Sequence, residues 1–402
     1  MPTRLILALA ILVALACDDS SNGGSSLQCG ADVPIQLTSK LDDDDGDGNP
    51  LDEAFPLIDD EDDDIADHTW ILDHAGVYHL FFQSESLYHP TQIEHYTTID
   101  FQHLDYVGTA LTVNPGAWDG DALWAPHIVE HDGSYYMFYT GVAGEGPDAV
   151  QRIGLATSRD LTTWTRASIN RCTGTTGDGC IYECDEPWTT WGGTSGSYNQ
   201  QCRDPFVMWD GDAQRWLLFT TARHTNAAGV VTVASASELT TWAGAGYLDA
   251  TRRIASGVEA QTTGGQCENP FVVATGGAYY LIFTDWEDAE DSVTVANPRT
   301  IAQYARSESL AIDATGSTNW IYHGYLPDPG VNAIEVIELE RAPGWLMSQS
   351  ISNRHSGVPR LHRRELRLKC VTFGEDGEID TANWGRVSNE SRVTGVGLES
   401  HE

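Results

Sequence analysis

Lysine is almost absent from this chain: among its 402 residues only Lys40 and Lys369 are lysines, within a total of 22 lysine and arginine residues. The 59 aspartate and glutamate residues outweigh them and give a formal net charge of −37 at pH 7. A surface this acidic repels phosphate backbones and anionic membranes, so nucleic-acid binding is close to excluded. Hydrophobic residues make up 41% of the chain, which is enough for a packed core. A neutral, hydrogen-bonding partner such as a carbohydrate suits this composition best.

Long apolar runs are also scarce, and the one that stands out lies at the N-terminus, from Leu5 to Ala16. It is too short for a permanent membrane span, so residues 1–16 are interpreted as a signal peptide and the protein as exported. Small residues lead to Cys17 and a polar stretch follows it, which resembles the processing site of a bacterial lipoprotein. An acylated Cys17 would then anchor the protein at the cell envelope or cell surface. An ordinary secretory peptide is the alternative.

Residues 17–64 are predicted to form a lipoprotein tether and an acidic arm. Within the arm, Asp43, Asp45 and Asp47 precede Gly48 and follow the D-x-D-x-D-G pattern that opens a calcium-binding loop. They are therefore candidate ligands for Ca²⁺, while no cofactor is expected to be required elsewhere. A solvated acidic spacer is the equally weighted alternative.

Seven further cysteines have no spacing typical of a zinc site, and disulfides are the better interpretation in an exported chain. We expect Cys172, Cys180 and Cys184 to constrain one long loop. Cys202 and Cys267 precede two candidate site residues in successive repeats, and we predict a disulfide between them if those repeats are adjacent.

One pattern recurs five times after residue 65: a short β-rich run, a turn with glycine or aspartate, and an aromatic strand. The copies begin near residues 67, 124, 203, 268 and 333. Amphipathic helical periodicity is scarce, so the repeats predict an all-β fold, a five-bladed β-propeller over residues 65–375. Residues 376–402 are predicted to form a C-terminal tail. A β-sandwich is the competing all-β fold, but it gives no reason for five aligned copies.

Three of the copies open with a carboxylate, namely Asp67, Asp204 and Glu268. The first strand of each propeller blade lines the central channel, so these side chains are expected to converge there. Acidic groups held together shift one another's pKa, an arrangement typical of a ligand, metal or reaction site.

The same segments resemble the five-bladed glycoside hydrolases of families 32, 43 and 68. Residues 78–83 (Y-H-L-F-F-Q), residues 137–141 (M-F-Y-T-G) and Arg203-Asp204-Pro205 are similar to family 32 motifs. Trp124-Ala125-Pro126 resembles the W-A-P-D of family 43, with His127 in place of the aspartate. The segment around Asp67 departs from the N-D-P-N of family 32, and few residues remain for the C-terminal β-sandwich common in that family.

The resemblance implies that Glu268 is the general acid and that Asp67 is the nucleophile of a retaining enzyme or the base of an inverting one. It implies that Asp204 stabilises the oxocarbenium-like transition state. Residues expected to bind substrate are Arg203, Trp70, Trp124 and His127. The predicted function is an exported glycoside hydrolase that cleaves O-glycosidic bonds of furanosides such as fructans or arabinans. A non-catalytic carbohydrate-binding propeller at the cell surface is the alternative.

Overall fold

The computed structural model describes residues 36–37, 67–84, 90–99, 101, 103–145, 148–191, 200–225, 229–251, 267–286, 300–312, 320–329, 331–339, 345–354, 362–374, 379–380 and 386–387. The predicted signal peptide, Cys17 and the candidate calcium ligands Asp43, Asp45 and Asp47 lie outside these residues. Among the described residues, no helix is long and apolar enough to cross a membrane.

The strands form five sheets. The first contains β2 (His68–Leu72), β3 (Tyr78–Ser84), β4 (Gln92–Thr98) and β5 (His103–Thr112), with β1 (Gln36–Leu37) parallel to β5 at its outer edge. The second contains β6 (Ala122–His131), β7 (Ser134–Ala143), β8 (Val150–Ser158) and β10 (Cys180–Tyr182), and β9 (Thr165–Arg166) also pairs with β8. The third contains β11 (Cys202–Asp210), β12 (Arg215–Arg223), β13 (Gly229–Ala236) and β14 (Ala243–Tyr247), and the short 3-10 helix η2 (Asp249–Thr251) follows it.

The fourth sheet contains β15 (Cys267–Thr275), β16 (Ala278–Trp286), β17 (Thr300–Ser307) and β18 (Ile321–Pro329). The fifth contains β19 (Val331–Glu338), β20 (Trp345–Arg354), β21 (His362–Phe373) and β22 (Ile379–Asp380), and β23 (Arg386–Val387) pairs with β21. Thus two short strands of the predicted tail, β22 and β23, add to the fifth sheet.

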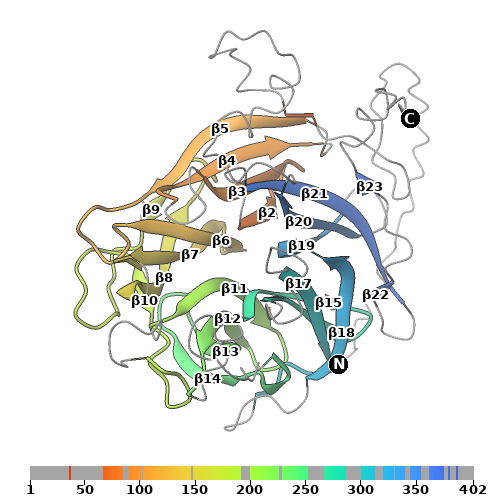
Figure 1. Cartoon of the computed structure of the whole chain (residues 1–402). Helices are drawn as coiled ribbons and strands as arrows, with labels where there is room; N and C mark the ends of the chain where they lie inside the picture. The colour runs from red at the N-terminus through yellow and green to blue at the C-terminus, as the bar shows by residue number, and fades with distance from the viewer. Residues whose placement is uncertain are drawn as a thin grey trace, which may run out of the picture.

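The sheets stand around a central axis, as Figure 1 shows. Their first strands, β2, β6, β11, β15 and β19, contact one another in a closed cycle. The predicted all-β propeller is confirmed, and the competing β-sandwich interpretation is wrong. The aromatic strands supply the core between the sheets, because Phe81, Phe138, Phe219 and Phe283 are each at most 1% exposed. Each such side chain contributes about 1.5–3 kcal/mol through burial of its apolar surface.

Four of the five first strands share a β-bulge close to the axis. The pairing register shifts at this point in β6, β11, β15 and β19. One residue in each bulge has a left-handed backbone: Ala125 (φ 44°), Asp204 (φ 56°), Asn269 (φ 50°) and Ala333 (φ 48°). A bulge bends its strand and redirects side chains, so this repeated feature determines which groups face the axis.

The bulges also join neighbouring sheets. The backbone N–H of Ala125 donates to Gln83 Oε1 at 3.0 Å. The next bulge repeats this contact, because the Asp204 N–H donates to Thr140 Oγ1 at 2.9 Å. The Asn269 N–H then donates to Asp204 Oδ2 at 3.1 Å. In three of the four bulges the backbone N–H is thus bonded to a side chain of the preceding sheet.

Side chains close the ring between the first and fifth sheets. The Trp70 backbone N–H donates to Glu335 Oε2 at 2.8 Å, and Trp70 Nε1 donates to Ser348 Oγ at 3.1 Å. Leu339 and Leu346 of the fifth-sheet segment pack into the apolar cluster of the first sheet. The two ends of the propeller are therefore held by packing and by hydrogen bonds from side chains.

Two disulfides are present in the described residues, Cys172–Cys180 and Cys184–Cys202. They constrain the long connection between the second and third sheets, as expected for Cys172, Cys180 and Cys184. The predicted Cys202–Cys267 disulfide is wrong. Cys202 packs in the cluster between the second and third sheets, whereas the buried Cys267 packs in the cluster between the third and fourth.

Candidate active site

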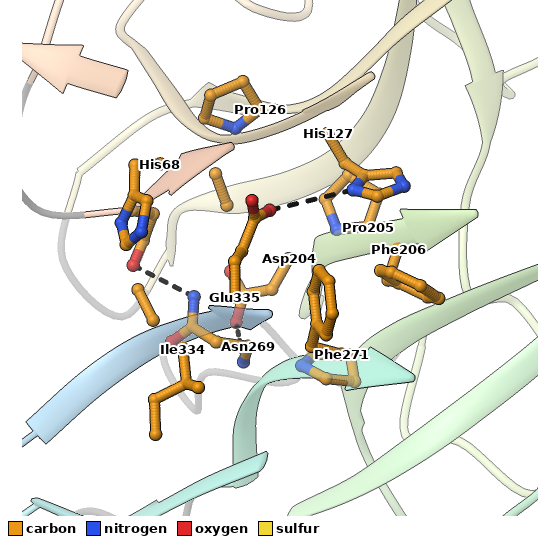
Figure 2. Close-up of a pocket in the computed structure, with 14 residues that line it drawn as sticks. His68, Pro126, His127, Asp204, Pro205, Phe206, Asn269, Phe271, Ile334 and Glu335 are labelled. Atoms are coloured by element: carbon orange, nitrogen blue, oxygen red, sulfur yellow. Dashed lines mark hydrogen bonds and ion pairs between the residues drawn. The ribbon is translucent and has the colours of Figure 1, made fainter. Parts of the chain in front are cut away.

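A pocket lies at the axis where the first strands of all five sheets meet (Figure 2). The residues that line it are Asp67, His68, Ala125, Pro126, His127, Asp204, Pro205, Phe206, Asn269, Pro270, Phe271, Ala333, Ile334 and Glu335. Each sheet thus contributes the residues at or beside its bulge, or at the equivalent start of β2. Carboxylates, imidazoles and an amide stand among phenyl rings and prolines, which is a typical lining for a binding pocket.

Asn269 connects two of the predicted carboxylates. Its side-chain Nδ2 donates to Asp67 Oδ1 at 2.9 Å, and its backbone N–H donates to Asp204 Oδ2 at 3.1 Å. Asp204 is only 5% exposed. Asp67 and Asp204, which are far apart in the sequence, are therefore held in fixed relation on the wall of the same pocket.

The third carboxylate, Glu268, is bound to Arg203. Arg203 Nη2 donates to Glu268 Oε1 at 3.0 Å, and Arg203 Nε lies 3.5 Å from Asp204 Oδ2. Glu268 is the immediate neighbour of Asn269 in β15. The structure thus brings Asp67, Asp204 and Glu268 together, with one asparagine and one arginine between them.

Burial raises the pKa of Asp204 from 3.8 to about 7. Arg203 and the Asn269 N–H lower this pKa, whereas the charges of Asp67 and Glu268 raise it. A carboxylic acid with such a pKa exchanges its proton near neutral pH. The protonation state of Asp204 therefore depends on the charges of Asp67 and Glu268.

The predicted substrate-binding residue Arg203 does not line the pocket. It is 5% exposed, and its Nη1 donates to Gln201 Oε1 at 3.1 Å and to Gln151 Oε1 at 3.4 Å. These hydrogen bonds and the contacts with Asp204 and Glu268 pair the guanidinium of Arg203 with groups of the protein itself. The structure places Arg203 in contact with Asp204 and Glu268, outside the residues that line the pocket.

The other predicted substrate-binding residues divide into two groups. His127 lines the pocket, whereas Trp70 and Trp124 do not. Trp70 is 8% exposed and packs against Phe101, with 5.3 Å between the ring centroids. Its position is that of a core residue, because the face of β2 that carries it is turned to the apolar cluster of the first sheet.

Three polar pocket residues were missed from the sequence, His68, Asn269 and Glu335. Asn269 lies in the Glu268-Asn269-Pro270 segment, and nothing in that segment predicts its hydrogen bond to Asp67. Glu335 lies in the fifth and weakest repeat, and its place in that repeat was the only sign that it lies near the axis. Within the described residues, no group of three or more histidine, cysteine, aspartate or glutamate side chains could hold a metal ion.

Asp67 and Asp204 line the axial pocket of this β-propeller, and Glu268 lies beside them on Arg203 without lining the pocket itself. Such a gathering of carboxyl groups fits a propeller glycoside hydrolase, because glycosidic cleavage requires paired carboxyl groups at one site. The family model of glycosyl hydrolases family 43 matches residues 62–379. The chain belongs to this family, and it is a glycoside hydrolase.

Solved structures show the same fold. An endo-arabinase from Bacteroides thetaiotaomicron has a TM-score of 0.55 at 14% identity, covering 78% of this chain and 95% of that one. An exo-1,5-α-L-arabinanase from a bovine ruminal metagenomic library has a TM-score of 0.51 at 16% identity, covering 79% and 97%. A Bombyx mori β-fructofuranosidase of family 32 has a TM-score of 0.54 at 14% identity, covering 77% and 61%. No curated protein matches the chain.

Proposed function

We propose that this family 43 glycoside hydrolase cleaves furanosides of the arabinan or fructan type through Asp67, Asp204 and Glu268, and that its five sheets are the five blades of the propeller. The observation that carries the catalytic assignment is the network in which Asn269 joins Asp67 to Asp204 while Arg203 joins Asp204 to Glu268. Two arabinanases among the similar structures support an arabinan-type substrate.

Glu268 is assigned as the general acid that protonates the leaving oxygen. Its Oε1 accepts from Arg203 Nη2, so Oε2 is the atom assigned to carry the transferred proton. Because protonated Glu268 no longer adds a negative charge, the pKa of Asp204 falls when Glu268 takes up the proton. The productive state therefore has a neutral Glu268 beside an ionised Asp204.

Asp67 acts on the other side of the reaction, either on the anomeric carbon as a nucleophile or on a water molecule as a base. The Asn269 Nδ2–H bond to Asp67 Oδ1 holds one oxygen of this carboxylate in place. The ionised Asp204 stabilises positive charge as it develops on the sugar ring. The anomer first formed by the wild-type protein, followed by NMR, distinguishes retention from inversion.

The location of the enzyme is a separate part of the proposal. Residues 1–16 direct export, and acylated Cys17 with the 17–64 segment anchors the propeller at the cell envelope. Asp43, Asp45 and Asp47 in this segment are proposed to bind Ca²⁺. Incorporation of labelled palmitate into the wild-type protein, and its loss in Cys17→Ala, would support the anchor. Incorporation into neither protein would contradict it.

A substrate screen tests the catalytic proposal. Purified protein is incubated with 4-nitrophenyl α-L-arabinofuranoside, 4-nitrophenyl β-D-xylopyranoside, arabinan, xylan and fructan, and released sugars are measured. We expect turnover of a furanoside, its loss on every substrate in Asp67→Asn, and its loss on the polysaccharide in Glu268→Gln. Binding of a polysaccharide without product release would instead favour the non-catalytic carbohydrate-binding propeller.

A further inference from the structure

Besides His68, which contacts Ser348, two polar residues of the axial pocket stand apart from the carboxylate network, His127 and Glu335. They come from β6 and β19, and their side chains point toward each other in Figure 2. His127 Nδ1 lies 3.9 Å from Glu335 Oε1. Both side chains are about nine-tenths buried, so their polar atoms must find partners within the pocket.

The hydrogen bond at the other ring nitrogen determines what His127 can offer. Its Nε2 lies 3.1 Å from the carbonyl oxygen of Val207, and since a carbonyl only accepts, Nε2 carries a proton. Nδ1 therefore faces the carboxylate either as a bare acceptor or as the second donor of an imidazolium.

Glu335 is held in a similar way. Its Oε2 accepts the backbone N–H of Trp70 at 2.8 Å, which anchors the carboxylate to the first strand of the neighbouring sheet. Its Oε1 is the oxygen that faces His127. The pair thus presents a ring nitrogen and a carboxylate oxygen, side by side, to whatever enters the pocket.

A hydroxyl group matches this pair because it donates one hydrogen bond and accepts others. An oxygen about 2.8 Å from both Nδ1 and Oε1 would see the two atoms at an angle of about 90°, which an sp³ oxygen accommodates. The separation of 3.9 Å is longer than a direct hydrogen bond, so the two groups do not satisfy each other fully. An ether oxygen or a substituted hydroxyl could not donate to Oε1.

Aromatic rings complete the surroundings of the pair. The His127 ring lies 4.5 Å from that of Phe206, which lies 4.7 Å from that of Phe271, and both phenylalanines line the pocket. They offer apolar surface to the C–H groups of a sugar and leave the His127–Glu335 pair as the polar feature of that wall.

We propose that His127 and Glu335 bind one free hydroxyl group of the sugar in the axial pocket through Nδ1 and Oε1. This proposal rests on the proposed function, since it places the sugar that is cleaved from the chain in this pocket. The pair acts as a specificity determinant: the enzyme accepts furanosides in which that hydroxyl is unsubstituted and rejects those that carry a branch or an ester there.

The test compares a 4-nitrophenyl glycoside that the wild-type protein hydrolyses with its monodeoxy and monodeoxyfluoro analogues. For the wild type, we expect one deoxy position to lower kcat/KM about 10- to 100-fold, because the pair is then left without its partner. His127→Gln and Glu335→Gln should lose a similar factor on the parent glycoside but less than about threefold on that one deoxy analogue. The fluoro analogue, which cannot donate, should behave like the deoxy analogue.

Matched controls lie on the same two strands. His131→Gln in β6 and Glu338→Gln in β19 change the same residue types at exposed positions, and both should keep the wild-type values. Thermal unfolding of each variant reports folding. If Glu335→Gln loosens the contact with Trp70, His127→Gln and His127→Asn carry the test.

Equal losses on the parent and on every deoxy analogue would overturn the proposal, since a merely structural role predicts that result. Unchanged kinetics in both pocket variants would also overturn it. If the wild-type protein hydrolyses no glycoside, the proposed function fails separately, and calorimetric binding of arabinose, xylose and fructose with their deoxy analogues replaces kcat/KM. Binding that is equal in the wild type and both variants would then refute the hydroxyl site.

Discussion

The stability of the propeller should depend on pH through one buried histidine of the first sheet. His95 in β4 is 2% exposed, its ring stacks on Phe81 at 4.1 Å, and its Nε2 lies 2.8 Å from His79 Nδ1. Burial, together with the charge of His79, lowers the pKa of His95 from 6.5 to about 3. Burial also lowers the pKa of His79. The folded protein therefore keeps His95 neutral at moderately acidic pH.

The consequence for stability follows from the difference in proton binding between the two states. In the unfolded chain His95 binds a proton near pH 6.5, but in the folded protein it resists protonation until about pH 3. The unfolded state thus binds more protons in this interval, and stability falls as the pH falls from 6.5 toward 3. At about 1.4 kcal/mol per pH unit, His95 should cost about 2 kcal/mol of unfolding free energy between pH 7 and pH 5.

Urea unfolding followed by tryptophan fluorescence at pH 7 and pH 5 measures this effect. His95→Gln removes the titrating ring, so its unfolding free energy should fall by about 2 kcal/mol less than that of the wild type over the same interval. His74→Gln, which changes an exposed histidine of the same sheet, should behave like the wild type. If the wild type and His95→Gln lose the same free energy between the two pH values, the reasoning is refuted.

Four further outcomes are expected. Glu268→Gln should lose most turnover of natural glycosides but much less of 4-nitrophenyl glycosides, whose leaving group needs little protonation; equal losses would contradict its role as the acid. Asp67→Asn should lose turnover on every substrate, and near-normal rates would show that the first-sheet assignment is wrong. Gly154→Ala should lower the unfolding free energy by about 1–3 kcal/mol in urea titrations, because a Cβ there overlaps two aromatic rings, whereas Gly211→Ala meets nothing within 4 Å and should not. Deleting residues 18–64 should leave kcat/KM unchanged, since the only described strand of this segment lies at the outer edge of the first sheet.

The repeat pattern was enough to predict the propeller and the meeting of three carboxylates. A turn followed by an aromatic strand is a local signal, and its fivefold recurrence leaves few alternatives for an all-β chain. Once the copies are aligned, residues at equal positions must lie at equal places around the axis. Asp204 and Glu268 could therefore be placed near each other without knowledge of their contacts.

The orientation of individual side chains could not be predicted in this way. Alternate residues of a strand face opposite sides, and a bulge of one residue reverses that alternation. Arg203 precedes such a bulge and is turned into the protein, where it contacts Glu268 and Asp204 and does not line the pocket. Trp70 faces the core because alternate residues of β2 point to opposite sides of the sheet. Glu335 was missed because its partner Trp70 is 265 residues away.

The manner in which the ring closes has a consequence for how the protein acquires its activity. The innermost strand of the first sheet, β2, can contact the fifth sheet only after Glu335 and Ser348 have been synthesised. Until then a growing chain leaves the apolar side of β2 without Leu339 and Leu346 to cover it, and the axial pocket lacks one wall. Contacts this distant in sequence form slowly, because a long loop must be closed before they stabilise anything. Partial chains should therefore be inactive and prone to association through this uncovered side, and a working pocket should arise only as the final step of folding.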